Sequence, residues 1–293
     1  MSMQWRRERY AVIVADDFGK SSSVNLAIAE AHDRGILSAA SIMAGEKAFE
    51  EAVSIARNRS RLSVGLHVTL CDGKSVLPQS EIPELVDMEG RFESSPSLAW
   101  MKYSRRTLQN QLDAEIGAQF DLLEEAGVQL GHVDSHHHLH MHPKLFAMIC
   151  RHASRRGIQW VRIPCEPLSL VCHSRDASQG AYPFVEWAVF RILRLYNGAQ
   201  IRLHGLQALP LYGLSRTGRV DEKYLFDLFT RSDDHMEILL HPDIATESGR
   251  RELDALISGA VRDKLKALGI NVTGYRQLSP EDLSLDTGVV KSL

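Results

Sequence analysis

The sequence predicts an α/β protein in which parallel strands and helices alternate to form an irregular, TIM-like (β/α) barrel. Apolar runs of strand length alternate with segments whose apolar residues recur at helical spacing. The 293 residues match the size of one such barrel, and no Pro/Ser/Gly-rich linker divides the chain. Ionisable residues follow several of the expected strands. We therefore expect residues 1–293 to form a single domain, although the length also allows two.

The first half of the chain alternates strand and helix patterns. The run at 10–15 is apolar and rich in β-branched residues, which is typical of a strand buried on both faces. A helix follows at 21–35, where Ser22 or Ser23 can cap its start and Gly35 ends it. Similar patterns predict strands at 36–45, 62–70 and 130–136, and helices at 47–59, 107–127 and 143–157. Residues 71–104 contain three prolines and a turn-rich tract, and we expect a lid-like excursion over the barrel there.

The second half continues the alternation after an irregular stretch at 166–184. Strands are expected at 158–164, at 235–243 and near 270–275. Helices are expected at 184–198, within 211–231 after a turn, and at about 250–268. The helix at 184–198 is strongly apolar.

Composition narrows the class of protein. The net charge of −3 gives no indication of nucleic-acid binding, which usually requires an excess of positive charge. The four cysteines, Cys71, Cys150, Cys165 and Cys172, show neither metal-binding spacing nor a dense disulfide pattern, and indicate mostly buried thiols in a reducing compartment. The apolar run near the N-terminus is too short for a signal peptide, and no stretch has the length of a membrane span. We expect a cytoplasmic enzyme.

Ionisable side chains collect at the C-terminal ends of the expected strands. These ends meet at one mouth of a (β/α) barrel, where active sites lie. The residues concerned are Asp16, Asp17, His67, His136, Arg162 and His241. Five separate strands would therefore deliver polar groups to the same face, and this shared position is the strongest argument for a catalytic site.

The adjacent aspartates suggest two different roles. Asp17, His67 and His136 would supply one carboxylate and two imidazoles to a divalent metal ion, leaving room for water. Asp16 would then be free to act as a general base on that water. Two imidazoles suit Zn²⁺, whereas carboxylate and water ligands also allow Mg²⁺. Taken alone, an Asp-Asp pair is more often a turn or a helix cap, and a single strand histidine is usually structural.

The tract "HVDSHHHLHMH" holds six of the thirteen histidines and indicates metal binding or catalysis. Strand alternation places Asp134 and His136 on one face, and Asp134 is a natural partner for a ring N–H of a metal-bound histidine. His140 is expected to line the pocket, and His138 to have a supporting or structural role. Arg162 alone would more often be a surface or ion-pair residue.

The motifs "ADDFG", "VGLHVTL", "HVDSHHHLHMHP", "RIP" and "ILLHPD" resemble those of the YdjC-like carbohydrate deacetylases, in the same order and across residues 12–243. The resemblance implies a barrel of the polysaccharide-deacetylase type and one divalent metal ion. It implies removal of an N-acetyl group from an amino sugar. Residues 75–92 look like the hopanoid-biosynthesis-associated branch, which implies a lipid-linked sugar. Many members have Asn where this chain has Val14.

The resemblance also assigns roles to individual residues. It implies that Asp17, His67 and His136 bind the metal and that Asp16 is the base, so the division of labour between the two aspartates depends on it. It implies that His241 protonates the leaving amine or steadies the oxyanion. In this scheme Arg162 could assist the oxyanion.

Other functions and partners remain open from the sequence. One rival is a metal-dependent phosphoesterase or other hydrolase on the same barrel, and another is a non-catalytic sugar- or metal-binding protein. The helix at 184–198, with Trp187, Phe190 and Leu193, could rest on a membrane surface, although a helix packed on the barrel is favoured. A homodimer is also left open.

Overall fold

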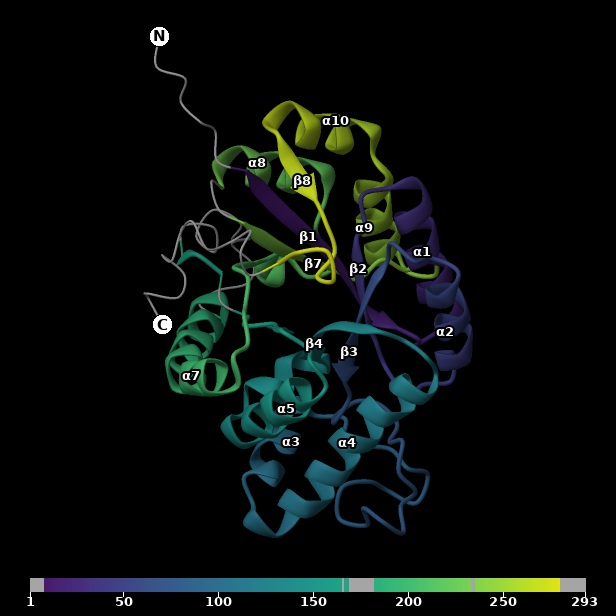
Figure 1. Cartoon of the computed structure of the whole chain (residues 1–293), viewed down its shortest axis with the longest axis vertical. Helices are drawn as coiled ribbons and strands as arrows, with labels where there is room; N and C mark the ends of the chain where they lie inside the picture. The colour runs from purple at the N-terminus through teal and green to yellow at the C-terminus, as the bar shows by residue number, and fades with distance from the viewer. Residues whose placement is uncertain (1–7, 165, 169–181, 233–234, 280–293) are drawn as a thin grey trace.

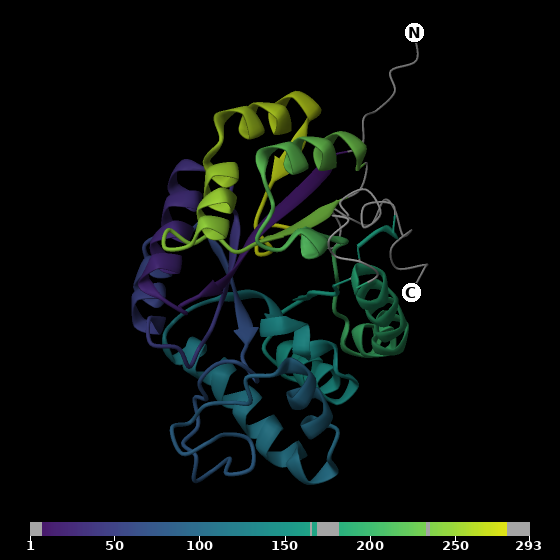
Figure 2. The ribbon, with the colours of Figure 1, turned by 180° about the vertical axis from the view of Figure 1, so that it is seen from behind.

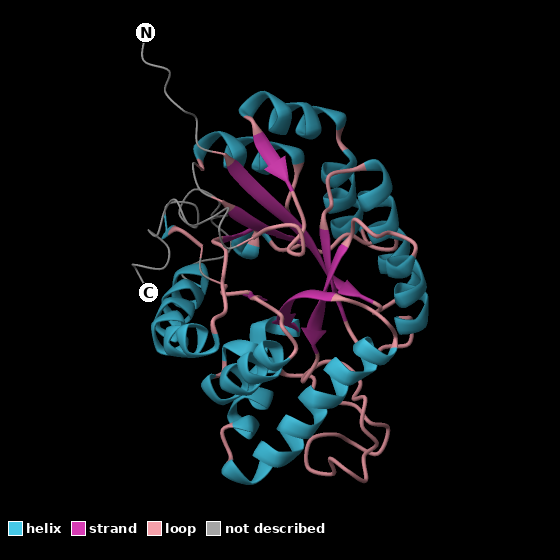
Figure 3. Cartoon of the chain, in the orientation of Figure 1, coloured by secondary structure: helices cyan, strands magenta, loops and turns pink. Residues whose placement is uncertain are grey.

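Eight parallel strands form one sheet at the centre of the molecule, and the helices lie around it (Figures 1 and 3). The computed structural model describes residues 8–164, 166–168, 182–232 and 235–279. The strands are β1 (Arg9–Phe18), β2 (Ala39–Ile42), β3 (Ser63–Val68), β4 (Leu130–Ser135), β5 (Trp160–Val161), β6 (Leu211–Tyr212), β7 (Met236–Leu240) and β8 (Ile270–Val272). Their order is β5-β4-β3-β2-β1-β7-β6, with β8 paired to β1.

The two ends of this strand order approach each other through the segment before β6. Val161 of β5 donates its N–H to the carbonyl of Gln207 at 2.9 Å, and Gln207 donates to the carbonyl of Gln159 at 2.7 Å. A few residues later Leu211 pairs with Glu237 of β7. The sheet therefore curves round as an irregular barrel, and the predicted α/β barrel class is confirmed.

The helices follow the predicted order, with differences at the second half of the chain. They are α1 (Ser22–Arg34), α2 (Phe49–Arg57), α3 (Pro96–Tyr103), α4 (Gln109–Glu125), α5 (Pro143–Arg155), α7 (Tyr182–His204), α8 (Glu222–Arg231), α9 (Glu247–Ile257) and α10 (Gly259–Leu268). The expected single helix at about 250–268 is two helices, because the backbone of Ser258 leaves the helical region (ψ 124°) and its hydroxyl caps α10 at Val261 N–H. Strand β6 and helix α3 were not predicted.

Side chains inside the barrel form a lower apolar layer and an upper charged layer. Val12 and Val14 point inward with Trp160 and Tyr275, whereas their β1 neighbours pack outward against the helices. By the same alternation Asp16 continues the inward face. Three buried charges join it at this level: Asp134 of β4, Glu237 of β7, and Arg162, which directly follows β5. The apolar floor and the surrounding helices keep water from these charges.

A bulge near the end of β1 changes the direction of Asp17. The pairing of β1 with β2 shifts between Ala15 and Phe18, and Asp17 has a left-handed backbone with φ of 65°. Gly19, with φ of 93°, then turns the chain away, and its N–H donates to Asn25 Oδ1 at 2.8 Å. In a regular strand Asp17 would point to the face opposite Asp16, whereas here its carboxylate faces the imidazoles of His67 and His136.

The excursion at 71–104 is attached to helix α4. Glu115 of α4 is buried and accepts hydrogen bonds from the N–H groups of Val76 and Leu77 at 2.9 and 3.0 Å. Burial raises the pKa of Glu115. Apolar side chains of the excursion, including Ile82 and Phe92, are buried, and the loop lies beside α4 in both views (Figures 1 and 2).

Helix α7 packs its inner face on the barrel. Phe190 and Leu193 lie against the core, and Trp187 Nε1 donates to the carbonyl of Glu166 at 2.9 Å. The residues considered for membrane contact therefore face the protein. None of the described helices combines the length and apolar content needed to cross a bilayer. Of the four cysteines, Cys71 and Cys150 are buried free thiols, and Cys165 and Cys172 lie outside the described residues.

Candidate metal centre

Arg162 is the centre of a buried ion network that we call the Arg162 network, comprising Asp16, Asp134, Arg162 and Glu237. Its guanidinium binds Asp16 through two bonds, Nη1 to Oδ2 at 2.6 Å and Nη2 to Oδ1 at 2.9 Å. Nη1 also lies 2.6 Å from Asp134 Oδ2, and Nε donates to Glu237 Oε1 at 2.5 Å. All four side chains are buried. The geometry holds Asp16 in a fixed orientation.

Charges within the network outweigh the cost of burial for two of its members. Burial opposes ionisation of Asp134, but Arg162 and His67 hold the pKa of this carboxyl well below its usual range. Burial likewise opposes the charge of Arg162, and Asp134, Asp16 and Glu237 raise the pKa of the guanidinium. For Glu237 burial is the larger effect, so its pKa is raised despite Arg162. Glu237 is therefore more readily protonated than Asp134.

Asp134 connects the network to His67. Asp134 Oδ1 lies 2.7 Å from His67 Nδ1, and Ser41 donates to Asp134 Oδ2 at 2.8 Å. Ser41 also contacts His132 Nε2 at 2.9 Å. With its Nδ1 engaged by Asp134, the ring of His67 presents Nε2 to Asp17. Burial acts to lower the pKa of His67, but Asp134 and Asp16 raise it.

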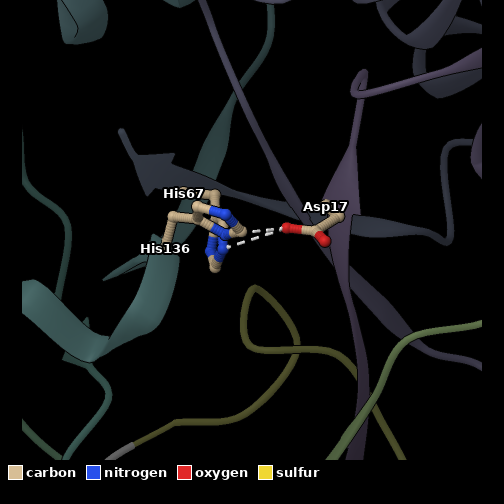
Figure 4. A group of neighbouring side chains, drawn as sticks. All are labelled: Asp17, His67 and His136. Atoms are coloured by element: carbon tan, nitrogen blue, oxygen red, sulfur yellow. Dashed lines mark ion pairs between the residues drawn. The ribbon is translucent and has the colours of Figure 1, made fainter. Parts of the chain in front are cut away.

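Asp17, His67 and His136 form a second group beside the network, the Asp17 cluster (Figure 4). Asp17 Oδ1 lies 3.0 Å from His136 Nδ1 and 3.6 Å from His67 Nε2. Its other oxygen, Oδ2, accepts from Lys20 Nζ at 2.9 Å. Burial acts to raise the pKa of Asp17, but His136, His241 and His67 hold it well below its usual range. Asp17 is therefore a carboxylate aimed at two imidazoles.

The donor atoms of the Asp17 cluster fit a divalent cation. One carboxylate oxygen and two imidazole nitrogens lie within 4.8 Å of one another. Within the described residues Asp17 Oδ1 and His136 Nε2 are buried and have no hydrogen-bond partner. Oδ1 does lie 3.0 Å from His136 Nδ1, but buried atoms without a well-formed hydrogen bond are costly, and a cation between the three side chains would satisfy them. The ligand atoms of Asp16, His67 and Asp134 also lie within 4.8 Å of one another, but Arg162 already binds both of these carboxylates.

The histidine tract turns sharply after β4. His136 begins a short 3₁₀ turn, η2 (His136–Met141), in which His137 and His138 have left-handed backbones. His140 is buried, with Nδ1 2.7 Å from Ser135 Oγ and Nε2 2.9 Å from the carbonyl of Arg162. Burial lowers the pKa of His140 to about 4. Its two ring nitrogens are thus engaged within the fold.

His138 and His241 complete the predicted set. Burial and the charge of Arg162 lower the pKa of His138 well below its usual value, and its ring meets that of Phe190 of α7 at 5.8 Å between centroids. His241 follows β7, and its backbone N–H donates to buried Glu252. Its buried Nδ1 has no hydrogen-bond partner within the described residues. His241 is close enough to Asp17 to lower the pKa of that carboxyl.

Four contributors to the site were missed by the sequence reasoning: Lys20, Ser41, Asp72 and Glu237. Glu237 carried the clearest signal, since it is an acidic residue inside the apolar strand "MEILL". Asp72 lies in the excursion, 3.7 Å from His136 Nε2 and 3.5 Å from His137 Nε2. Ser41 and Lys20 carry no pattern that would distinguish them from ordinary strand and loop residues.

Known proteins resemble this chain in sequence. A carbohydrate deacetylase of Brevibacillus brevis is 35% identical over 153 residues, 52% of this chain and 58% of that protein. A chitooligosaccharide deacetylase of Salmonella typhimurium is 32% identical over 155 residues, with 52% and 58% of the two chains covered. The aligned part therefore spans about three fifths of the curated relatives.

A solved structure resembles the chain over a longer stretch. A putative cellobiose-phosphate cleavage protein of Enterococcus faecalis V583 matches with a TM-score of 0.71 and 24% identity, covering 93% of this chain and 99% of its own. At this identity the match establishes the shared fold. The model of the family described as YdjC-like protein matches residues 10–267, which include the Asp17 cluster and the Arg162 network. The chain therefore belongs to the YdjC-like protein family.

Proposed function

We propose that the chain is a metal-dependent carbohydrate deacetylase that hydrolyses the N-acetyl group of an amino sugar to acetate and a free amine. The observation that carries this proposal is the contrast between Asp16 and Asp17. One carboxylate is fixed by Arg162, and its neighbour is aimed at two imidazoles. Relatives named carbohydrate deacetylase and chitooligosaccharide deacetylase support the same chemistry.

Asp17, His67 and His136 are the residues that would hold one divalent ion, Zn²⁺ or Mg²⁺. When bound, such an ion supplies a Lewis acid for the acetyl carbonyl and lowers the pKa of a water molecule. Asp134 keeps His67 oriented, because it occupies Nδ1 and leaves Nε2 for coordination. Lys20 binds Asp17 Oδ2, so Oδ1 is the oxygen that would be available to the ion.

Asp16 and His241 are the groups we assign to proton transfer. Asp16 takes a proton from the attacking water as the water oxygen bonds to the acetyl carbon. His241 gives a proton to the sugar nitrogen as the C–N bond breaks, so that acetate and the amine are formed. The unpaired Nδ1 of His241 and its proximity to Asp17 support this role.

For Arg162 we propose a positioning role in place of the oxyanion contact considered from the sequence. Its guanidinium is fully buried, and its nitrogens bind three carboxylates. The guanidinium therefore directs its N–H groups to carboxylates of the fold, which argues against a contact with the substrate oxyanion. Arg162 instead fixes the orientation of Asp16 and compensates its charge.

The acceptor is proposed to be an N-acetylglucosamine unit on an oligosaccharide or a lipid. The lipid-linked case, in the hopanoid-associated branch, depends on the likeness of residues 75–92. We also propose that the excursion at 71–104 borders the substrate, since Asp72 at its start lies beside His136 and His137.

Acetate release tests the proposal. The protein is incubated with N-acetylglucosamine, N,N′-diacetylchitobiose, an N-acetylglucosaminyl lipid and a phosphate monoester, with and without chelator, and products are measured by mass spectrometry. We expect acetate from at least one acetylated sugar and its loss with chelator. Phosphate release without acetate would replace this proposal with a phosphoesterase. If the protein binds metal but turns over none of these substrates, the result would favour a non-catalytic binding protein.

A further inference from the structure

The two imidazoles of the Asp17 cluster have a carboxylate on the side away from Asp17, but at different distances. His67 turns Nε2 to Asp17, and its Nδ1 lies 2.7 Å from Oδ1 of the fully buried Asp134 (Figure 4). In His136 the nitrogens are reversed, with Nδ1 3.0 Å from Asp17 Oδ1 and Nε2 3.7 Å from Asp72 Oδ2. The second carboxylate is therefore at hydrogen-bond distance from His67 and just beyond it from His136.

Either ring nitrogen of His136 can take an ion, and the surroundings of the two nitrogens differ. Nε2 is buried and has no hydrogen-bond partner within the described residues. Its ligand atom groups with those of Asp72 and His137, in a set separate from the one that contains Asp17 and His67. An ion at Nδ1 would fix the ring proton on Nε2, where Asp72 could accept its hydrogen bond. The ion and the carboxylate would then satisfy the whole ring.

The main chain of Asp72 is held in place, although its side chain is 52% exposed. Its N–H donates to the carbonyl of Glu93 at 3.0 Å, and the carbonyl of the next residue, Gly73, accepts from Phe92 N–H at 3.0 Å. Phe92 is buried in the core. The fold thus fixes the start of the Asp72 side chain, and its exposed carboxylate can rotate over the short remaining distance to His136.

Backbone strain marks the same part of the molecule. Four non-glycine residues in the described part of the chain have left-handed backbones: Asp17, Asp72, His137 and His138. Such conformations carry a steric cost and persist where the surrounding structure enforces them, commonly at functional sites. A glycine would adopt the φ of 46° found at Asp72 more easily, so this carboxylate is present at a cost to stability.

We propose that Asp72 is a positioning residue for the metal centre, which accepts a hydrogen bond from His136 Nε2 and leaves Nδ1 for the ion. The inference rests on the proposed function only in requiring a divalent ion at this centre. Asp72 does for His136 what Asp134 does for His67, but it is half-exposed and comes from the excursion at 71–104. A partner carboxylate orients the ring and makes the coordinating nitrogen more basic, so its removal weakens metal binding.

A second ion between Asp72, His136 and His137 is the competing arrangement. Their ligand atoms also lie within 4.8 Å of one another, and His137 Nε2 is 3.5 Å from Asp72 Oδ2. However, ions on both nitrogens of His136 would require the ring to lose its N–H proton, whereas a hydrogen bond to Asp72 keeps the ring neutral. We therefore expect one ion per chain.

Zinc titration of the metal-free protein tests the positioning role. Asp72→Gly removes the carboxylate and suits the left-handed backbone, so the variant should unfold at a similar urea concentration. We expect the unaltered chain to bind one Zn²⁺, and Asp72→Gly to bind it about 10- to 100-fold more weakly in competition with a chromophoric chelator. Glu81→Gln, which removes an exposed charge from the same excursion, is the matched control and should bind normally.

The titration has outcomes that separate this inference from the proposed function. Tight zinc binding that is unchanged in Asp72→Gly would overturn the inference alone, as would an equal loss in Glu81→Gln. Asp72→Asn keeps an oxygen acceptor, and its affinity should lie between those of Asp72→Gly and the unaltered chain. Two zinc ions per chain would replace the hydrogen bond with the second site. A chain that binds no divalent ion would contradict the proposed function as well.

Nuclear magnetic resonance identifies the nitrogen that binds the ion. In zinc-loaded protein with ¹⁵N-labelled histidine, long-range proton–nitrogen spectra distinguish a coordinated ring nitrogen from one that carries a proton. We expect zinc at Nδ1 of His136 and a proton at Nε2, with the signals identified by their loss in His136→Asn. In Asp72→Gly this proton should exchange faster with water, because its acceptor is absent. Zinc at Nε2 of His136 would overturn the inference.

Discussion

The Arg162 network and the Asp17 cluster begin at neighbouring residues and differ in how completely their polar atoms are paired. In the Arg162 network both oxygens of Asp16 bind the guanidinium. In the Asp17 cluster one carboxylate oxygen and one ring nitrogen have no hydrogen-bond partner within the described residues. The comparison teaches that the Arg162 guanidinium, whose nitrogens are all engaged by carboxylates of the fold, serves to orient Asp16. In the Asp17 cluster, buried oxygen and nitrogen atoms that lack a hydrogen-bond partner are suited to binding a ligand such as a metal ion.

Removing Arg162 should have the largest effect. Arg162→Met leaves Asp16, Asp134 and Glu237 buried without their counter-charge, and we expect a loss of roughly 3–5 kcal/mol of unfolding free energy. Urea denaturation measures it. Arg251→Met, which removes an exposed ion pair with Glu247, is the control and should cost less than about 1 kcal/mol. A similarly small loss for Arg162→Met would mean that the network is not held by its arginine.

The two aspartates should separate metal binding from turnover. We expect Asp17→Asn to lose bound metal and activity together, because its carboxylate faces both imidazoles. Asp16→Asn should keep the metal and lower kcat by roughly 10²- to 10⁴-fold, as expected for loss of a general base. Metal content by mass spectrometry and acetate release are the measurements. An active Asp16→Asn enzyme would contradict the role of Asp16, whatever its metal content.

Acid should destabilise the metal-free protein through two buried histidines. Burial lowers the pKa values of His132 and His140 to about 4, from an ordinary 6.5. Between these values the unfolded chain binds more protons than the folded one, so stability falls as pH falls from about 6.5 to about 4. Each group contributes at most about 1.4 kcal/mol per pH unit. Urea denaturation with chelator measures the slope, which His132→Gln should reduce; an unchanged slope would exclude His132.

Glu237 should show the smallest effect, and only with a conservative change. Glu237→Gln keeps an acceptor for Arg162 Nε, and because burial opposes the charge of Glu237 and raises its pKa, the loss of that charge should cost less than about 1 kcal/mol. Glu237→Ala removes the acceptor and should lower kcat at nearly constant KM. If both variants lower kcat equally, the negative charge of Glu237 is required.

The sequence predicted the order of most elements and brought the right residues into consideration. The strand-end rule selected Asp17, His67 and His136, and the structure places their donor atoms within 4.8 Å of one another. Their role in metal binding stays a prediction. The sequence could predict that these three residues lie close together because the C-terminal ends of parallel strands meet at one face of the barrel, whatever the length of each strand.

What could not be predicted depended on contacts between distant segments. Arg162 was identified, but its three carboxylate partners come from β1, β4 and β7, and no local pattern joins them. Strand β6 has two residues, too few for a period-2 signal. Ser258 ends one helix and caps the next, which the continuous apolar pattern concealed.

The left-handed backbone of Asp17 has a consequence for how the chain can change over evolutionary time. A glycine would adopt φ of 65° without the penalty of about 1 kcal/mol that a side chain brings. Selection for stability alone would therefore favour Asp17→Gly, and selection for chemistry would forbid it. A lineage that no longer needed the reaction could lose this aspartate early while keeping the barrel intact.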